Sequence, residues 1–470
     1  MQPINRDILR LALPSIAANI TTPLLGLVDT AITGHMGSVL YLAAISVGSV
    51  MFNMLYWLFG FLRAGTSGLS AQACGRGDMR DSMLVLMRSL SVAVTVGVLM
   101  IACRAPLANL LTAIVSPDAA TEPLSREYFS ILIWGAPAML ATYSFTGWFL
   151  GQQNSRINLW VSLVINLTNI ASSLLLVYGA GLKVNGVASG TLIAQWTGLV
   201  ASLFFLRKFS LAHVSLAEVL RWQEFKRFFS VNGAIMLRGM LMITVTVWFT
   251  RAGASQGAVI LSVNTMLMQM FLLFSYFSDG FAYAGEALVG KFTGLSDRGE
   301  EKRCVSALFA WGWILSIAFT CLYFFGGEEF LSLLSSDKEV RLASNDYWLW
   351  AVSVPIAGFA GFVWDGIYIG ATMVKGMLGA TAAGAVVFVT VYALTFRTLG
   401  NHGLWLAFIC WLLTRGIVQW IIYRLRKPGD STPKNKALSH KKSRGWGGVW
   451  ASRFRRSRRE LPYGSDRRER

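Results

Sequence analysis

Apolar stretches of about 20 residues recur along the whole chain of 470 residues. Each stretch is long enough to cross the ~30 Å hydrocarbon core of a bilayer as one helix. Charged residues make up only 14% of the chain, whereas a soluble protein carries roughly a quarter. The mean hydropathy of +0.52 agrees with this composition. The sequence therefore predicts an all-α, polytopic membrane protein.

The apolar pattern predicts twelve transmembrane helices joined by mostly short loops rich in Gly, Asn and Pro. Their expected ranges are 8–33, 39–73, 82–103, 124–149, 157–178, 186–206, 228–250, 257–289, 303–325, 345–370, 376–396 and 402–424. A longer basic connector separates the sixth span from the seventh. We therefore expect four parts in the chain: an N-lobe at 1–206, a cytoplasmic linker at 207–227, a C-lobe at 228–424 and a tail at 425–470.

The two halves resemble each other at an offset of 219 residues. The same offset matches residues in three pairs of helices. Chance matches between glycines would not give the same offset in three pairs. The matched pairs are Gly34 with Gly253, Gly75 with Gly294, Tyr128 with Tyr347, and Gly151 with Gly370. Six helices in each half preserve the orientation of the repeat, so the lobes should be related by an axis along the membrane normal. Such duplicated bundles bind substrate at or near the lobe interface and work by alternating access.

The distribution of Lys and Arg predicts the orientation. Segments on one side of the membrane, before the tail, carry roughly twice as many Lys and Arg residues as the opposite loops. We therefore expect a multi-pass protein of the plasma membrane, the inner membrane in a bacterium, with both termini in the cytoplasm. The basic tail at 425–470 is expected to be disordered, and solvated or in contact with anionic lipid rather than nucleic acid.

Several motifs together resemble the multidrug and toxic compound extrusion (MATE) family, particularly its DNA-damage-inducible-protein-F-like branch. They are RLALPSIAANITTPLLGLVDTAITGHMGS in the first span, RAGTSGLSAQACGRGD, SDGFAYAGEALVGK, WDGIYIGATMVKGM and NHGLWLAF. The resemblance runs from about residue 4 to residue 425. It implies two six-helix lobes and export driven by inward flow of protons or sodium ions, and it does not fix the substrate. The basic tail departs from the family, whose chains usually stop soon after the twelfth helix.

Asp29 lies near the outer end of the first span. A carboxylate at the bilayer centre costs on the order of 2.5–3.5 kcal/mol of insertion free energy, and one near an interface costs less. Asp29 could be an interfacial cap, because the turn at Gly34 is close. The resemblance places a coupling aspartate here, and Pro14 and Pro23 in the same span can free backbone carbonyls toward a cavity. We expect Asp29 to exchange a proton, a sodium ion or a cationic substrate.

Polar residues of the fourth to sixth spans are the expected neighbours of Asp29. We assign Asn169 and Ser173 to coupling with Asp29. Ser173 stands where the branch usually has an aspartate, which leaves Asp29 as the sole acidic group of the N-lobe cavity. The expected substrate cavity contains Thr22, Tyr143, Thr146, Asn166, Thr191 and Gln195. The alternative is hydrogen bonding between helices, which is common in membrane bundles.

The second lobe contains three further carboxylates inside its spans, Asp279, Glu286 and Asp365. Arg238 is the expected partner of either Asp279 or Asp365, because a lone charge is costly in a membrane. A structural salt-bridge cluster and a second ion site are equally compatible with this pattern. A sodium ion, if one binds, is expected at Asp29 or Asp365.

We predict a secondary active antiporter that exports organic compounds, cationic or amphipathic, in exchange for protons or sodium ions. A lipid or oligosaccharide flippase of the same wider superfamily is the alternative, although it would line its cavity with Arg or Lys. A membrane-embedded enzyme is the remote alternative, since no HExxH or GxSxG motif occurs. We expect a monomer that meets a small-molecule substrate and lipids, with no nucleic acid, no cofactor and no firm metal site.

Overall fold

A computed structural model describes residues 3–209, 213–334 and 337–426 of the chain. Twelve helices in this part are long and apolar enough to cross a membrane, and they match the twelve predicted spans within a few residues. The prediction of an all-α fold with twelve transmembrane helices is therefore confirmed. The expected disordered tail falls almost entirely on residues 427–470, which lie outside the described residues.

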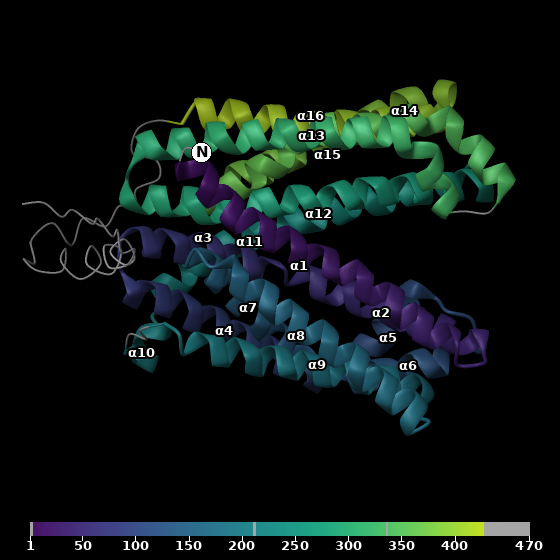
Figure 1. Ribbon diagram of the computed structural model, residues 1–470, viewed down its shortest axis with the longest axis horizontal. Helices are drawn as coiled ribbons and strands as arrows, with labels where there is room; N and C mark the ends of the chain where they lie inside the picture. Colours follow the sequence, from purple (N-terminus) through teal and green to yellow (C-terminus); the bar gives the residue numbers. More distant parts are fainter. Residues whose placement is uncertain (1–2, 210–212, 335–336, 427–470) are drawn as a thin grey trace, which may run out of the picture. The chain divides into compact units, whose positions relative to one another are not determined.

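The first six spans contain the N-terminal helices (Figure 1). They are α1 (Pro3–Gly34), α2 (Val39–Leu58) continued by α3 (Phe61–Gly75), α4 (Met79–Ala102), α6 (Glu122–Leu132) continued by a 3-10 turn and α7 (Ala136–Gly151), α8 (Ser155–Leu174) continued by the π-helical turn η2 (Leu175–Gly179), and α9 (Lys183–Leu206). The last six are α11 (Trp222–Ala254), α12 (Ala258–Leu295), α13 (Arg298–Leu334), α14 (Lys338–Gly370), α15 (Val374–Leu399) and α16 (Asn401–Arg424).

One helix is additional to the predicted spans. The segment expected to connect the third and fourth spans contains α5 (Arg104–Val115), an apolar helix of 12 residues. At 1.5 Å of rise per residue, α5 is about 18 Å long and too short to span a bilayer. The expected linker at 207–227 also contains a short helix, α10 (Leu216–Val219), and α11 begins inside it. The boundaries assigned to the two lobes and the linker stay a prediction.

Proline explains one contact between α1 and α8. Pro14 lies inside α1 and has no backbone N–H, so the carbonyl of Arg10 loses its partner within the helix. The hydroxyl of Ser155, at the start of α8, donates a hydrogen bond to this carbonyl oxygen at 3.3 Å. Further along, the hydroxyl groups of Thr21 in α1 and Ser162 in α8 form a hydrogen bond, with their oxygens 2.9 Å apart. A proline-containing helix is thus held against α8 by polar contacts.

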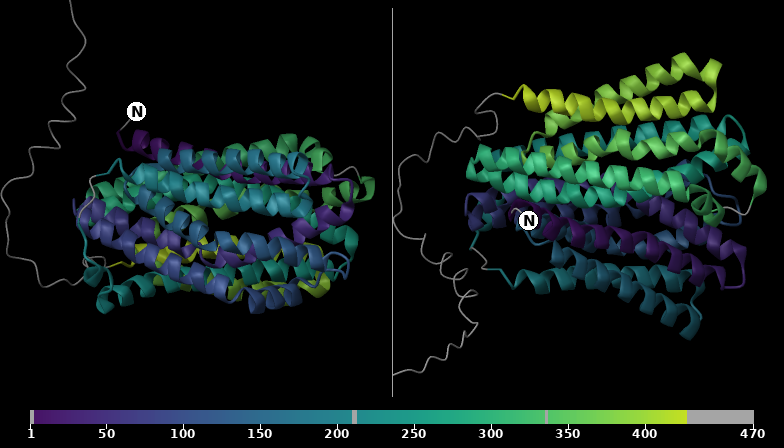
Figure 2. Two further views of the ribbon diagram at one scale, coloured as in Figure 1. Left: turned by 90° about the horizontal axis from the view of Figure 1, so that it is seen from below. Right: turned by 45° about the horizontal axis from the view of Figure 1, so that its top comes forward.

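The repeat of 219 residues reappears in the packing of α3 against α12. In the right view of Figure 2, purple and blue helices of the first half lie beside green helices of the second half. Gly75 of α3 lies so close to the Lys291 carbonyl of α12 that a Cβ atom there would approach the oxygen to 2.1 Å. Gly294 of α12 lies in the same way against the Gln72 carbonyl of α3, where the distance would be 2.2 Å. Gly75 and Gly294 are 219 residues apart, and so are Gln72 and Lys291, so the two halves meet here through equivalent surfaces.

Candidate functional site

Asp29 lies on α1 where this helix meets the end of the fifth span. The Tyr178 hydroxyl, in η2, donates a hydrogen bond to the Ile32 carbonyl of α1 at 3.0 Å, which fixes the two segments together. Asp29 is half-buried, and its Oδ1 atom is buried without a hydrogen-bond partner among the described residues. A carboxylate oxygen in this position is available for a proton, a cation or water.

Tyr128 brings Asp29 together with the polar residues of α9. The Tyr128 side chain comes from α6, is buried, and packs its ring on Gly48 of α2. Its hydroxyl interacts electrostatically with Asp29 and lies beside the side chain of Thr191. Thr191 in turn accepts a hydrogen bond from the Asn169 amide nitrogen at 2.9 Å. Tyr128 therefore connects Asp29 with Thr191 and, through Thr191, with Asn169. From the sequence, Tyr128 was predicted only as part of the repeat.

A second tyrosine extends this polar wall. Tyr56 of α2 is buried, and its hydroxyl lies near the side chains of Tyr143, Gln195 and Tyr128. Two of these, Tyr143 and Gln195, are predicted cavity residues. Tyr56 was not predicted, and the signal that could have found it is a tyrosine inside an apolar span, because a buried phenol needs a polar neighbour.

Ser173 has a packing role in addition to its place beside the predicted site. Its side chain is 0% exposed on α8, and it faces Gly190 of α9. A Cβ atom at Gly190 would come within 2.4 Å of the Ser173 hydroxyl oxygen. The two helices therefore approach closely at this point, and the longer side chain of an aspartate would not fit without moving them apart.

Thr146 and Thr22 are two more of the predicted cavity residues. Thr146 of α7 donates to the Tyr143 carbonyl of its own helix at 3.0 Å, and its carbonyl accepts from the Asn158 amide of α8 at 2.9 Å. These contacts fit the alternative of hydrogen bonding between helices. Thr22 is exposed on α1. The assignment of both residues to the substrate cavity stays a prediction.

Tyr56 and five of the predicted site residues each carry a buried polar atom without a hydrogen-bond partner among the described residues. In an apolar environment each such atom costs about 1–3 kcal/mol. The group, taken from the described residues, consists of Asp29 Oδ1, Tyr56 Oη, Asn166 Nδ2, Asn169 Oδ1, Ser173 Oγ and Gln195 Oε1. These atoms come from α1, α2, α8 and α9. A set of donors and acceptors of this kind can receive water, a proton or the polar groups of a ligand.

In the second half, Asp365 of α14 is saturated with donors. Arg238 of α11 forms an ion pair with it, which confirms Arg238 as the partner of one of the two aspartates. Arg415 of α16 donates to the same carboxylate at 2.6 Å, and the Gln419 amide donates at 2.9 Å. Two guanidinium groups thus share one carboxylate. Asp279 interacts electrostatically with Arg238 and helps to balance the surplus positive charge.

Glu286 is engaged by an arginine from the other half of the chain. Arg63 of α3 donates two hydrogen bonds to the carboxylate of Glu286 in α12, both at 3.2 Å. The guanidinium also lies over the ring of Tyr283, 4.1 Å from its centroid. Arg63 interacts with Tyr143 as well, and Tyr143 borders the wall around Asp29. A continuous series of polar side chains therefore leads from α1 to α12.

No group of three or more His, Cys, Asp or Glu side chains within the described ranges could hold a metal ion. The carboxylates of the two halves instead meet tyrosines, amides and arginines. The arrangement can protonate and deprotonate one carboxylate in a polar wall, while the ion pairs of the other half hold their helices together.

Comparisons with known proteins point to one family. A family model described as MatE matches residues 14–175. The chain is 36% identical to DNA damage-inducible protein F of Escherichia coli (strain K12), over 88% of this chain and 91% of that protein. It is also 23% identical to the probable multidrug resistance protein NorM of Thermotoga maritima, over 72% and 74% of the two chains.

Solved structures support the same fold. A crystal structure of a MATE protein in its bent conformation matches with a TM-score of 0.81 and 18% identity, over 90% of this chain and 95% of that one. An outward-facing structure of a multidrug resistance MATE family transporter matches with a TM-score of 0.76 and 19% identity, over the same shares. At these identities the likeness shows the fold alone.

Proposed function

We propose that this chain, which belongs to the MATE family of membrane transporters, exports organic compounds in exchange for protons or sodium ions. The observation that supports this proposal most is the buried and unpartnered carboxylate oxygen of Asp29 within a polar wall. A group that binds either the coupling ion or a cationic substrate produces antiport, because each ligand favours a different state of the transporter. The family consists of transporters, and we propose no enzymatic activity.

The proton is the coupling ion that the site supports better. Asp29 is the one carboxylate of this wall, because Ser173 replaces the aspartate expected beside it. A proton needs one oxygen, whereas a dehydrated metal cation needs several. Asp365, the other expected sodium site, already accepts from Arg238 and Arg415. Two guanidinium groups at this carboxylate repel a third cation.

The side chains near Asp29 suit cationic or amphipathic organic compounds. Tyr56, Tyr128 and Tyr143 contribute aromatic side chains to the wall that contains this single carboxylate, and aromatic faces attract organic cations. Few, well-placed polar groups in an otherwise apolar wall are typical of small-molecule sites. We propose a monomer that releases such compounds to the outside of a plasma membrane, with no cofactor besides the coupling ion.

The flippase alternative loses support from the arginines of the spans. Flippases for anionic lipid-linked sugars need free cations in the cavity. Here Arg63 is paired with Glu286, and Arg238 and Arg415 are paired with Asp365. Arg88 donates to backbone carbonyls of the linker segment at 3.1 and 3.2 Å. These four arginines of the spans are thus engaged within the protein.

Transport into inverted membrane vesicles tests the proposal. Vesicles that contain the protein should accumulate a fluorescent organic cation when the interior is acidified. Collapse of the pH gradient should stop this accumulation, and collapse of a sodium gradient should leave it unchanged. Accumulation that follows the sodium gradient alone would contradict proton coupling, and no accumulation under either gradient would contradict cation antiport.

The orientation makes a separate prediction. Lys and Arg are concentrated on the side of the membrane where both termini lie. A reporter enzyme fused after Arg424 should be active in the cytoplasm, and one inserted between α13 and α14 should be active outside. Protease protection of the two fusions measures the same property independently. An external signal from the first fusion would overturn the proposed orientation.

A further inference from the structure

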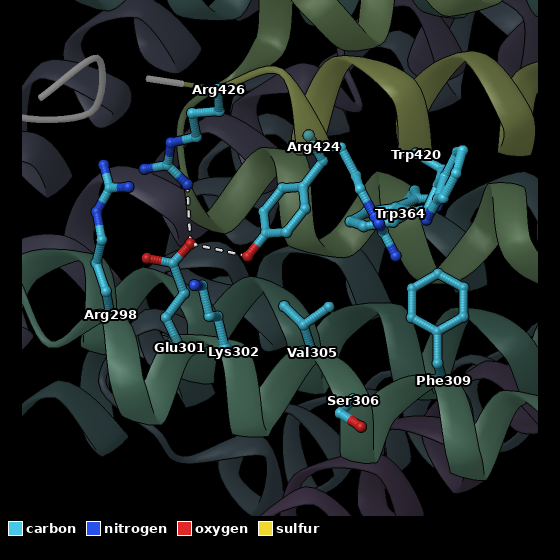
Figure 3. A pocket seen from close by; sticks show the side chains of 11 residues that line it. Arg298, Glu301, Lys302, Val305, Ser306, Phe309, Trp364, Trp420, Arg424 and Arg426 are labelled. Carbon is cyan, nitrogen blue, oxygen red and sulfur yellow. Dashed lines mark hydrogen bonds and ion pairs between the residues drawn. The ribbon is translucent and has the colours of Figure 1, made fainter. Parts of the chain in front are cut away.

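A basic and aromatic pocket lies away from the site around Asp29, where α13 begins and α16 ends (Figure 3). Its volume is about 710 Å³, within the ~300–1,000 Å³ of small-molecule sites. Residues on one side of α13 form one wall, and α14, α16 and Arg426 just after α16 supply the rest. The distribution of Lys and Arg places this end of the bundle at the cytoplasmic surface.

The pocket has a surplus of positive charge. Arg298, Lys302, Arg424 and Arg426 line it together with a single carboxylate, Glu301. Glu301 is buried and accepts from Arg426 at 2.8 Å and from the Tyr423 hydroxyl at 3.2 Å. One carboxylate cannot neutralise Lys302, Arg424 and Arg426 together, so an anion in this pocket would gain charge-assisted hydrogen bonds.

Arg426 provides an independent indication of a ligand. Its side chain is only 6% exposed, and its Nη1 atom donates a hydrogen bond to the carboxylate of Glu301. Its Nε and Nη2 atoms are buried without a hydrogen-bond partner among the described residues. A buried donor without an acceptor is costly, and a guanidinium pairs well with the oxygens of a phosphate. The guanidinium of Arg426 is therefore held at the pocket with two donors available to an anion.

The aromatic side chains locate the pocket at a membrane surface. Phe309 packs edge-on against Trp364, with ring centroids 4.9 Å apart, at the inner end of the pocket. Trp420 is 46% exposed and lies beneath the guanidinium of Arg424, 4.8 Å from it. Tryptophan is enriched at the level of the lipid headgroups. Cations beside such a tryptophan are therefore suited to the level of the lipid phosphates.

Apolar surface continues from the pocket toward the membrane interior. Trp313 lies one turn after Phe309 on α13, and Ile417 lies one turn before Trp420 on α16. Both side chains are exposed. Residues one turn apart share a helix face. This surface can accept acyl chains, which a soluble phosphate compound does not have.

We propose that this pocket binds the phosphate-bearing headgroup of an anionic phospholipid from the cytoplasmic leaflet. Basic pockets between transmembrane helices on the cytoplasmic side recognise such headgroups. The chain beyond Arg426 is itself strongly basic, so its charge does not complement the pocket. A bound lipid would connect the start of α13 to the end of α16, and so anchor the last spans to the membrane surface.

Native mass spectrometry of the purified full-length protein tests this site by titration with phosphatidylglycerol. The variant Lys302→Gln/Arg424→Gln removes two exposed cations of the pocket. We expect it to weaken phosphatidylglycerol binding about 25-fold, since each basic side chain near anionic lipid contributes about fivefold. The matched control Arg207→Gln/Lys208→Gln removes two exposed cations near the end of α9 and should bind the lipid as the unchanged protein does.

Two further arms identify the ligand. Phosphatidylcholine, which has no net charge, should bind at least about tenfold more weakly than phosphatidylglycerol. Glycerol 3-phosphate should fail to displace bound phosphatidylglycerol, because it lacks the acyl chains. Equal binding by the pocket variant and the control variant would overturn the site. Displacement by glycerol 3-phosphate would assign the pocket to a soluble phosphate compound instead. If the double variant does not fold, Lys302→Gln alone should weaken binding about fivefold.

Discussion

The substitution Asp29→Asn should reduce gradient-driven efflux to the level of vesicles without the transporter. The amide has the size and shape of the protonated acid, so the protein should fold, insert and still bind substrate. It can no longer release a proton or attract a cation, and a ligand that does not distinguish the two states cannot drive the cycle. The measurement is efflux of a fluorescent cation, normalised to the amount of protein in the membrane.

Asp7→Asn provides the matched control for this experiment. Asp7 lies on the same helix, α1, but is exposed near its other end and away from the polar wall. This variant should transport as the unchanged protein does. Wild-type efflux by Asp29→Asn would mean that Asp29 is only an interfacial cap. The coupling site would then have to be sought at Asp279 and Asp365.

The companion variant Ser173→Asp should not restore efflux to Asp29→Asn. Ser173 is fully buried against Gly190, so a carboxylate there would force α8 and α9 apart or remain without a partner. We expect a lower unfolding temperature and no recovery of transport. Restored efflux by the double variant would show that a carboxylate on α8 can replace the one on α1.

The sequence was sufficient for the spans because hydropathy reports directly on burial in lipid. The sequence was also sufficient to predict the structural repeat of the two halves. Gly147 lies against the Arg63 carbonyl, and its counterpart Gly366 lies against the Ala282 carbonyl, each at 2.1 Å from an added Cβ atom. Only glycine fits at such positions without a shift, because the backbones of the two helices touch there. A pattern of matched glycines therefore carries structural information even without a family.

Contacts between segments that are far apart in the sequence were harder to predict from it. Tyr128 and Tyr56 belong to apolar spans, and only the packing of α2, α6 and α9 shows that their hydroxyls border the wall around Asp29. The cost of a lone charge predicted Arg238 as the partner of either Asp279 or Asp365 without deciding between them, and the second arginine at Asp365, Arg415, was missed. Local composition indicates that a charge needs a partner, and it does not indicate how many partners converge.

The ion pair between Arg63 and Glu286 is the clearest contact of this kind, since 223 residues separate its members. The Glu286 side chain is 2% exposed. Removal of one member leaves a buried charge without a partner, which costs about 3–5 kcal/mol. Glu286→Gln and Arg63→Met should therefore each lower the temperature of thermal unfolding of the purified transporter clearly.

The double variant Arg63→Met/Glu286→Gln should recover much of this loss, because no unpaired charge remains and an apolar replacement for a buried ion pair is often neutral. A double-mutant cycle measures the coupling between the two positions. Arg303→Met/Glu300→Gln is the matched control, because that pair lies on the surface of α13 and its arginine side chain is 77% exposed. Surface pairs contribute about 0–1 kcal/mol, so this control should unfold at nearly the unchanged temperature. Additive losses at Arg63 and Glu286 would show that the two side chains stabilise the protein separately, and that the contact between α3 and α12 rests on the packing of their glycines.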